Sequence, residues 1–178
     1  MSDSRNSRSH YGYAGIEHAF RQDLHGTIHA GIRYTDWYNP PQATETAPYV
    51  MANLRYAYTA GSSLDLGVTH DQNATDVFTV KANSTTKAAD STVAYASIKH
   101  QLLPNLYGGA IGTFQYSTFM GGSVDNQSEK FYELGLNLEY RFNRNLSASV
   151  GYNFDKADSD VRGSYDRNRI YIGATASY

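Results

Sequence analysis

The stretch Tyr132-Glu-Leu-Gly-Leu-Asn-Leu-Glu-Tyr-Arg-Phe142 alternates strictly between apolar and polar side chains. A β-strand turns successive side chains to opposite faces, so the even-numbered residues form one apolar face and the odd-numbered residues one polar face. The same parity recurs in residues 64–69, 146–155 and 169–178, where the even positions are apolar and the odd ones mostly polar or glycine. The sequence therefore predicts a meander of strands that keeps one face apolar throughout.

A barrel that turns its polar face inward needs lipid on its outside, because the apolar face is then left exposed. We therefore expect residues 1–178 to form one all-β domain, an antiparallel up-and-down transmembrane β-barrel located in the bacterial outer membrane. The alternative is a soluble β-sandwich or a lipocalin-like barrel that buries the apolar face.

Composition is compatible with a barrel and excludes other classes. The formal net charge of -2 gives no reason to expect a nucleic-acid partner, and a chain without cysteine offers no disulfide or thiolate chemistry. A mean hydropathy of -0.55 is compatible with a membrane barrel, because barrel strands place only every second residue against lipid. The 16 tyrosines favour strands and membrane interfaces.

The alternation and the turn signals predict about nine strands of the length that a tilted membrane strand needs, roughly 9–11 residues. We place these strands at 11–21, 27–38, 48–58, 63–72, 92–102, 106–118, 130–142, 146–157 and 167–178. Short and long connections alternate between them. Since outer-membrane barrels have short periplasmic turns and longer extracellular loops, the long connections at 39–47, 73–91, 119–129 and 158–166 are expected outside the cell.

Aromatic residues recur at both ends of the predicted apolar face, and the hairpins repeat with a period of about 40 residues. A propeller has a similar period, but its blades have four short strands and no constant polarity. Aromatic girdles at the two membrane interfaces explain the pattern better. The periplasmic girdle is predicted to contain Phe20, Tyr56, Tyr58, Tyr140 and Phe142, and the outer one Tyr34, Tyr116, Tyr132, Tyr152 and Phe154.

The closing part of the chain, from Tyr140 to Asp155 and from Tyr165 to Gly173 with a terminal Tyr178, resembles bacterial outer-membrane β-barrel proteins of the porin type. The resemblance is strongest over residues 130–178. It implies a C-terminal signal for the barrel assembly machinery, carried here by Tyr171, Gly173 and Tyr178. Ala176 departs from that signal, because an aromatic residue is usual at its position.

Nine spans with the C-terminus in the periplasm place residue 1 outside the cell, whereas single-chain barrels have an even strand number. Residues 1–10 have no apolar signal-peptide core and read as the end of an extracellular loop. We therefore expect the chain to be the C-terminal segment of a larger barrel that has an odd number of strands upstream. An eight-stranded barrel is the alternative.

No motif for catalysis, metal or cofactor binding is evident. His25 and His29 would be about 13 Å apart in an extended strand, too far to share an ion. The acidic residues at 155, 158, 160 and 166 lack the spacing of an EF-hand. Ser63 and His70 belong to no motif of a serine hydrolase. We expect no enzyme activity and no cofactor.

The polar face carries charges of both signs, which would line the lumen. These predicted lumen residues are Glu17, Arg33, Arg55, Asp65, Lys99, Glu133, Glu139, Arg141, Asp155 and Arg169. We expect a porin-like channel for the passive diffusion of small hydrophilic solutes across the outer membrane of a Gram-negative cell. The alternative is a closed structural or adhesion barrel whose extracellular loops bind a partner. The strand number separates the two, because a barrel of about 8 strands is filled by side chains, whereas a barrel of about 16 or more strands encloses a channel.

Overall fold

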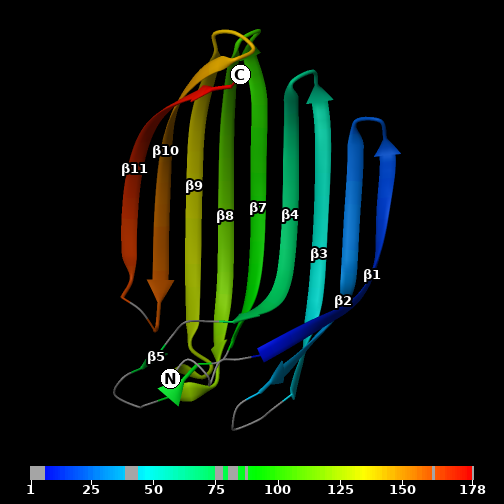
Figure 1. The fold of residues 1–178 in the computed structure, drawn as a ribbon, viewed down its shortest axis with the longest axis vertical. Coiled ribbons are helices and arrows are strands. Elements are labelled where there is room, and N and C mark those ends of the chain that lie inside the picture. The colour runs from blue at the N-terminus through cyan, green and yellow to red at the C-terminus, as the bar shows by residue number, and fades with distance from the viewer. Residues whose placement is uncertain are drawn as a thin grey trace.

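In the computed structural model, residues 7–38, 44–74, 78–79, 84–86, 88–161 and 163–177 are described. Within them, each long strand pairs with its neighbour in sequence to form a nine-stranded antiparallel sheet (Figure 1). Its strands are β1 (Ser7–Arg21), β2 (Leu24–Trp37), β3 (Thr44–Thr59), β4 (Ser62–Ala74), β7 (Ala88–Leu103), β8 (Leu106–Met120), β9 (Ser128–Arg141), β10 (Leu146–Ser159) and β11 (Tyr165–Ala176).

The register keeps even residues opposite even residues in all eight strand pairs. Leu136, for example, lies between Ala110 and Tyr152. The register shifts of the sheet fall beside short turns, at 19–21, 56–59 and 101–103, so they do not exchange the faces in the body of a strand. All even-numbered side chains of the sheet body therefore share one face.

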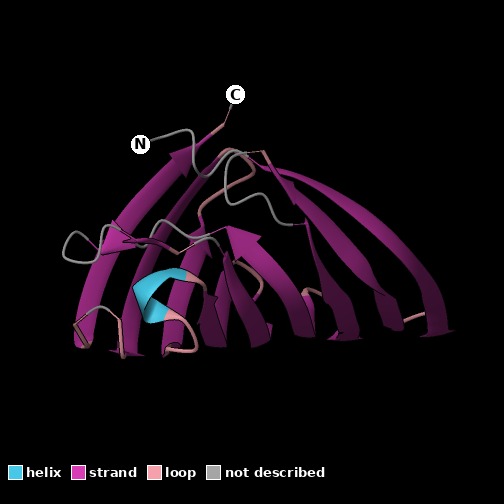
Figure 2. Ribbon diagram, turned by 90° about the horizontal axis from the view of Figure 1, so that it is seen from below, coloured by secondary structure: helices cyan, strands magenta, loops and turns pink. Residues whose placement is uncertain are grey.

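The sheet is bent into an arch, with β1 and β11 as its unpaired edges (Figures 1 and 2). Odd residues line the concave face, where the curvature brings side chains together. The Tyr11 hydroxyl on β1 donates a hydrogen bond to Asp71 Oδ2 on β4, three strands away, at 3.0 Å. Even residues form the convex face, and its large apolar side chains are exposed. The exposed fractions of Leu134, Leu136 and Leu138 are 45%, 46% and 45%.

The long-loop end of the arch carries a small core on its concave side. The 3₁₀ helix η3 (Gly122–Val124) follows β8, and its Val124 clusters with the buried side chains of Ala89 and Phe119. Figure 2 shows this helix, in cyan, beneath the arch. A loop at this end thus folds back against the concave face. No helix in the described part of the chain is both long and apolar enough to cross a membrane.

The predicted fold class is confirmed, and so are the number and order of its strands. The predicted bounds were too short at the long-loop ends of every strand of the sheet except β2, which instead begins at Leu24 rather than at residue 27. Residues 7–10, expected in a loop, belong to β1, and the expected loop 73–91 contains the start of β7 and the two-residue strands β5 (Phe78–Thr79) and β6 (Ser84–Thr85). Strand pairing continues there because backbone hydrogen bonds do not require an apolar face.

Candidate functional site

The concave face is the candidate site, because all nine strands place charged or polar side chains on it. The ten predicted lumen residues lie within these strands and share the odd parity of that face. Their contacts follow from the arch, which brings residues of neighbouring strands together. Most of the charges are paired with a charge of opposite sign.

Among the described residues, four ion-pair groups lie along this face. Arg33 Nη1 is 3.6 Å from Asp71 Oδ1, and Arg55 Nε is 3.6 Å from Asp65 Oδ1. In the third group Arg141 Nε is 2.8 Å from Glu139 Oε1. In the fourth, Asp155 Oδ2 is 2.7 Å from Arg167 Nη2 and 3.0 Å from Arg169 Nη2. Pairing lowers the cost of holding charges on a partly shielded surface.

Asp155 is the most buried of these charges, with its side chain 1% exposed. Its Oδ2 accepts hydrogen bonds from Arg167 Nε and Nη2 and from Arg169 Nη2. One carboxylate thus holds two guanidinium groups of the edge strand β11. Arg167 was missed by the sequence analysis, although its odd number and its place two residues before Arg169 pointed to it.

Arg33 and Asp71 belong to a second network, near the long-loop end of β1–β4. Arg33 Nη2 donates to Ser9 Oγ at 3.0 Å, and the guanidinium lies 5.4 Å from the centroid of the Tyr11 ring. Tyr11 in turn meets Tyr49 edge-to-face at 5.6 Å. The network joins four strands, β1 to β4, and explains why these two charges are nearly buried, with side chains 12% and 17% exposed.

Glu17 and Glu133 also lie on the concave face, where they form no ion pair with another described residue.

In the β1–β2 turn, Arg21 Nε donates to Asp23 Oδ1 at 2.9 Å. This hydrogen bond lowers the pKa of the Asp23 carboxyl. The turn is exposed, so the pair orders the rim of the sheet rather than its interior.

The sequence analysis assigned only convex tyrosines to the girdles and named Tyr171 only in the assembly signal, so it missed the tyrosines that line the concave face. They are Tyr11, Tyr13, Tyr49, Tyr95, Tyr107, Tyr165 and Tyr171. Their odd numbers were the signal that could have found them. Several lie over a glycine of the neighbouring strand. A Cβ on Gly67 would be 2.3 Å from Tyr95 Cε1, and one on Gly151 would be 2.2 Å from Tyr171 Cζ.

The predicted girdle residues all lie on the convex face. Two pairs of these rings contact one another at the short-turn end, Tyr56 with Tyr58 at 6.1 Å and Tyr140 with Phe142 at 5.0 Å between centroids. Tyr34, Tyr116 and Tyr132 lie toward the long-loop end. Tyr152 and Phe154 lie nearer the middle, opposite Leu136 and Leu134.

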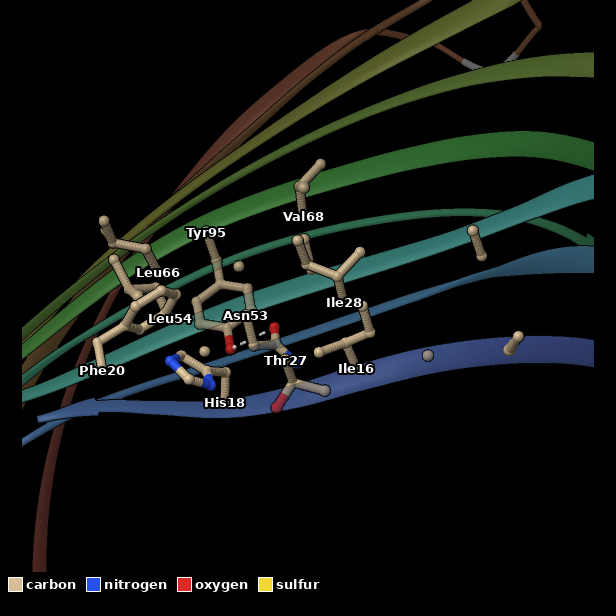
Figure 3. A pocket seen from close by; sticks show the side chains of 16 residues that line it. Ile16, His18, Phe20, Thr27, Ile28, Asn53, Leu54, Leu66, Val68 and Tyr95 are labelled. Atoms are coloured by element: carbon tan, nitrogen blue, oxygen red, sulfur yellow. Dashed lines mark hydrogen bonds between the residues drawn. The ribbon is translucent and has the colours of Figure 1, made fainter. Parts of the chain in front are cut away.

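A shallow hollow of about 780 Å³ lies over β1–β4 and is lined mainly by side chains of the convex face. Figure 3 shows Ile16, Ile28 and Leu54 among these side chains. Small residues such as Ala30 and Ala52 are also among the lining residues. The hollow is therefore part of the apolar surface and not of the charged one.

Of the predicted assembly signal, Tyr171 and Gly173 lie on the edge strand β11 with odd, concave parity, and Tyr178 lies outside the described residues. The residues considered for chemistry do not converge. Ser63 and His70 point to opposite faces, His29 stacks on Tyr13 at 5.3 Å, and Asp160 accepts from Ser128. The described residues contain no group of three or more side chains able to hold a metal ion.

The fold and its two faces define a class, an antiparallel up-and-down barrel sheet with a polar concave face and an apolar convex face. The chain belongs to the family described as "Putative beta-barrel porin 2", whose model matches residues 1–178. The expected resemblance, strongest over residues 130–178, is thereby confirmed, and the match extends over residues 1–178. A comparison with curated proteins gave no match.

Proposed function

We propose that the chain forms part of the wall of an outer-membrane pore through which small hydrophilic solutes diffuse passively. The observation that carries the proposal is the division of one sheet into an apolar convex face and a charged concave face. The family supports a porin-like barrel. Solute and mode of passage are the proposed part.

The convex face supports a membrane location. Its exposed large apolar side chains run along β1 to β11, including Ile16 at 73% and Ile172 at 84% exposure. Soluble monomers rarely expose so extended an apolar surface, whereas a lipid-facing barrel requires one. Aromatic rings near both ends of this surface match the headgroup regions of a bilayer. Since outer-membrane barrels have short periplasmic turns and longer extracellular loops, we assign the short turns to the periplasm and the long loops to the outside.

The open arch supports a pore rather than a filled barrel. Both edges, β1 and β11, run in the same direction because the number of described antiparallel strands is odd. Closure by antiparallel pairing therefore requires an odd number of further strands, from the same polypeptide or from another one. A barrel of about eight strands is filled by its own side chains, and wider ones hold water. The paired charges of the concave face would line that water.

The edge strand β11 also supports a role in assembly. Tyr171 and Gly173 lie on an unpaired edge, where the barrel assembly machinery would have access to the backbone. We propose this machinery and outer-membrane lipid as the partners of the chain.

The test is conductance of the closed barrel purified from its native membrane. Planar-bilayer recording is expected to show uniform steps, and liposomes containing the barrel are expected to swell in small sugars but not in large dextrans. A barrel that inserts stably yet gives neither conductance nor swelling would contradict the pore and favour a closed adhesion barrel that acts through its loops.

A further inference from the structure

A cluster of charged side chains surrounds one tyrosine at the short-turn end of the concave face. Lys99 lies on β7, Tyr107 on β8, and Glu139 and Arg141 on β9. Glu139 is directly opposite Tyr107 in the register. Lys99 Nζ is 5.2 Å and Arg141 Cζ 4.3 Å from the Tyr107 ring centroid. We call these four residues the Tyr107 cluster.

Positive charge is in excess here. The carboxylate of Glu139 is already engaged, since Arg141 Nε donates to its Oε1 at 2.8 Å. Lys99 forms no ion pair with any residue that the structure describes, and the same holds for Arg144 in the adjacent β9–β10 turn. Two cations, Lys99 and Arg141, thus lie beside Tyr107 with a single carboxylate, and a third, Arg144, lines a hollow that Glu139 also lines. This arrangement differs from the pairs Arg33–Asp71 and Arg55–Asp65, in each of which one cation contacts one anion.

Two hollows adjoin the Tyr107 cluster and share Tyr107 and Glu139. One of about 280 Å³ also contains Lys99 and Asn137, and Gly109 contributes no side chain to it. The other, of about 570 Å³, contains Arg141 and Arg144. The wall of the second hollow is otherwise mainly polar, with Asn105, Asn143, Asn145, Ser147, Thr175 and Ser177. The cations therefore face open space that a solute can enter.

We propose that the Tyr107 cluster is a binding subsite for small anionic solutes that carry a carboxylate or phosphate group. The planar guanidinium of Arg141 suits such oxygens and keeps donors beyond the one used by Glu139. Lys99 adds a point charge from β7, the strand on the other side of β8 from Arg141. The side chain of Arg141 is 45% exposed, so the subsite concentrates anions at the pore end rather than holding them tightly. The inference rests on the proposed pore only in that solutes reach the cluster through the lumen.

The test measures the binding of inorganic phosphate to the purified barrel in detergent, with ³¹P NMR line broadening as the readout. Saturable binding is expected. Lys99→Gln is expected to raise the dissociation constant about tenfold, as for the loss of one charged contact. It removes no ion pair, so the fold is kept. Lys156→Gln is the matched control, because it removes one lysine charge from the convex parity, where Lys156 lies 3.6 Å from Asp158. Its binding is expected to equal that of the unaltered barrel.

Absence of saturable binding, or equal weakening by both lysine variants, would overturn the subsite. A second variant, Arg141→Gln, is expected to weaken binding as well, with heat-shift electrophoresis confirming a folded barrel. The binding measurement needs no conductance. A barrel that binds phosphate without conducting would refute the pore alone, and one that conducts without binding would refute the subsite alone.

Discussion

Glycines of the concave face make room for large side chains that lie flat against the sheet. Gly67 on β4 sits between Asn53 on β3 and Tyr95 on β7, and the Tyr95 hydroxyl donates to Asn53 Oδ1 at 3.4 Å above it. Gly151 lies under Tyr171 in the same manner. Curvature crowds side chains on the inside of an arch, so a residue without a side chain allows its neighbour to cover it.

Replacing Gly67 with valine is expected to destabilise the barrel by about 1–3 kcal/mol, because the new Cβ would overlap Tyr95 and Asn53. Urea unfolding in lipid vesicles measures the change. Gly112→Val is the control, since a Cβ there has no atom within 4 Å. Equal losses at both positions would show that strand propensity, and not the Tyr95 contact, is responsible.

Arginine at Leu136 is expected to cost about 2–4 kcal/mol in a bilayer, because this side chain lies in the middle of the convex face. Arginine at the adjacent Asn137, on the concave face, is expected to cost much less since water reaches it. Both are measured by the free energy of unfolding from vesicles. A larger cost at Asn137 would indicate a soluble sheet with a dry concave side.

Which face a residue occupies was predictable from its parity, but its contacts were not. Tyr11 and Asp71 are 60 residues apart and meet only because three strand registers and the bend of the sheet add together. Alternation contains no information about that bend. For the same reason the pairing of Arg33 with Asp71, and of Asp155 with two arginines, could not be read from the sequence.

At the scale of elements, the edge strand β11 is held to β10 both by backbone hydrogen bonds and by ion pairs. It pairs with β10 over 146–157, and Arg167 and Arg169 both bind Asp155. Strand edges are vulnerable to mispairing, and a buried carboxylate shared by two arginines fixes the register at this one.

Asp155→Asn is expected to lower the free energy of unfolding by about 1–3 kcal/mol, because two guanidinium groups lose their charged acceptor. Asp158→Asn is the control, since its pair with Lys156 is exposed and worth little. Chemical unfolding of the two variants gives the comparison. Equal effects would mean that Asp155 does not anchor β11.

The two ends of the hairpins are expected to face opposite compartments. A cysteine at Ser164, in the long β10–β11 loop, should react with a membrane-impermeant maleimide on intact cells. A cysteine at Asn105, in the short β7–β8 turn, should react only after the outer membrane is opened. Labelling of Asn105 alone on intact cells would invert the proposed orientation.

Strand number and order followed from the sequence because apolar alternation marks the part of each strand with an apolar face. The structure of the long connections did not. The η3 turn depends on glycines at φ +77° and +74° and on Val124 reaching Ala89 and Phe119. These are tertiary contacts without any periodic signal.

At the scale of the molecule, the nine-stranded sheet is expected to be unstable as a bilayer-spanning unit on its own. Unpaired backbone groups on β1 and β11 cost several kcal/mol each in hydrocarbon. The 178-residue chain refolded alone is therefore expected to aggregate or to give irregular currents in planar bilayers. A heat-modifiable monomer with uniform conductance steps would show instead that β1 and β11 pair in parallel and complete a pore.

The confinement of register shifts to the short turns makes each hairpin an independent unit of construction. Duplicating or deleting a whole hairpin would change the circumference while every remaining side chain kept its compartment. Inserting a single residue within a strand would instead exchange concave-face and convex-face residues from that point to the next turn. Such a chain is therefore expected to tolerate the gain or loss of a whole hairpin better than the insertion of one residue within a strand.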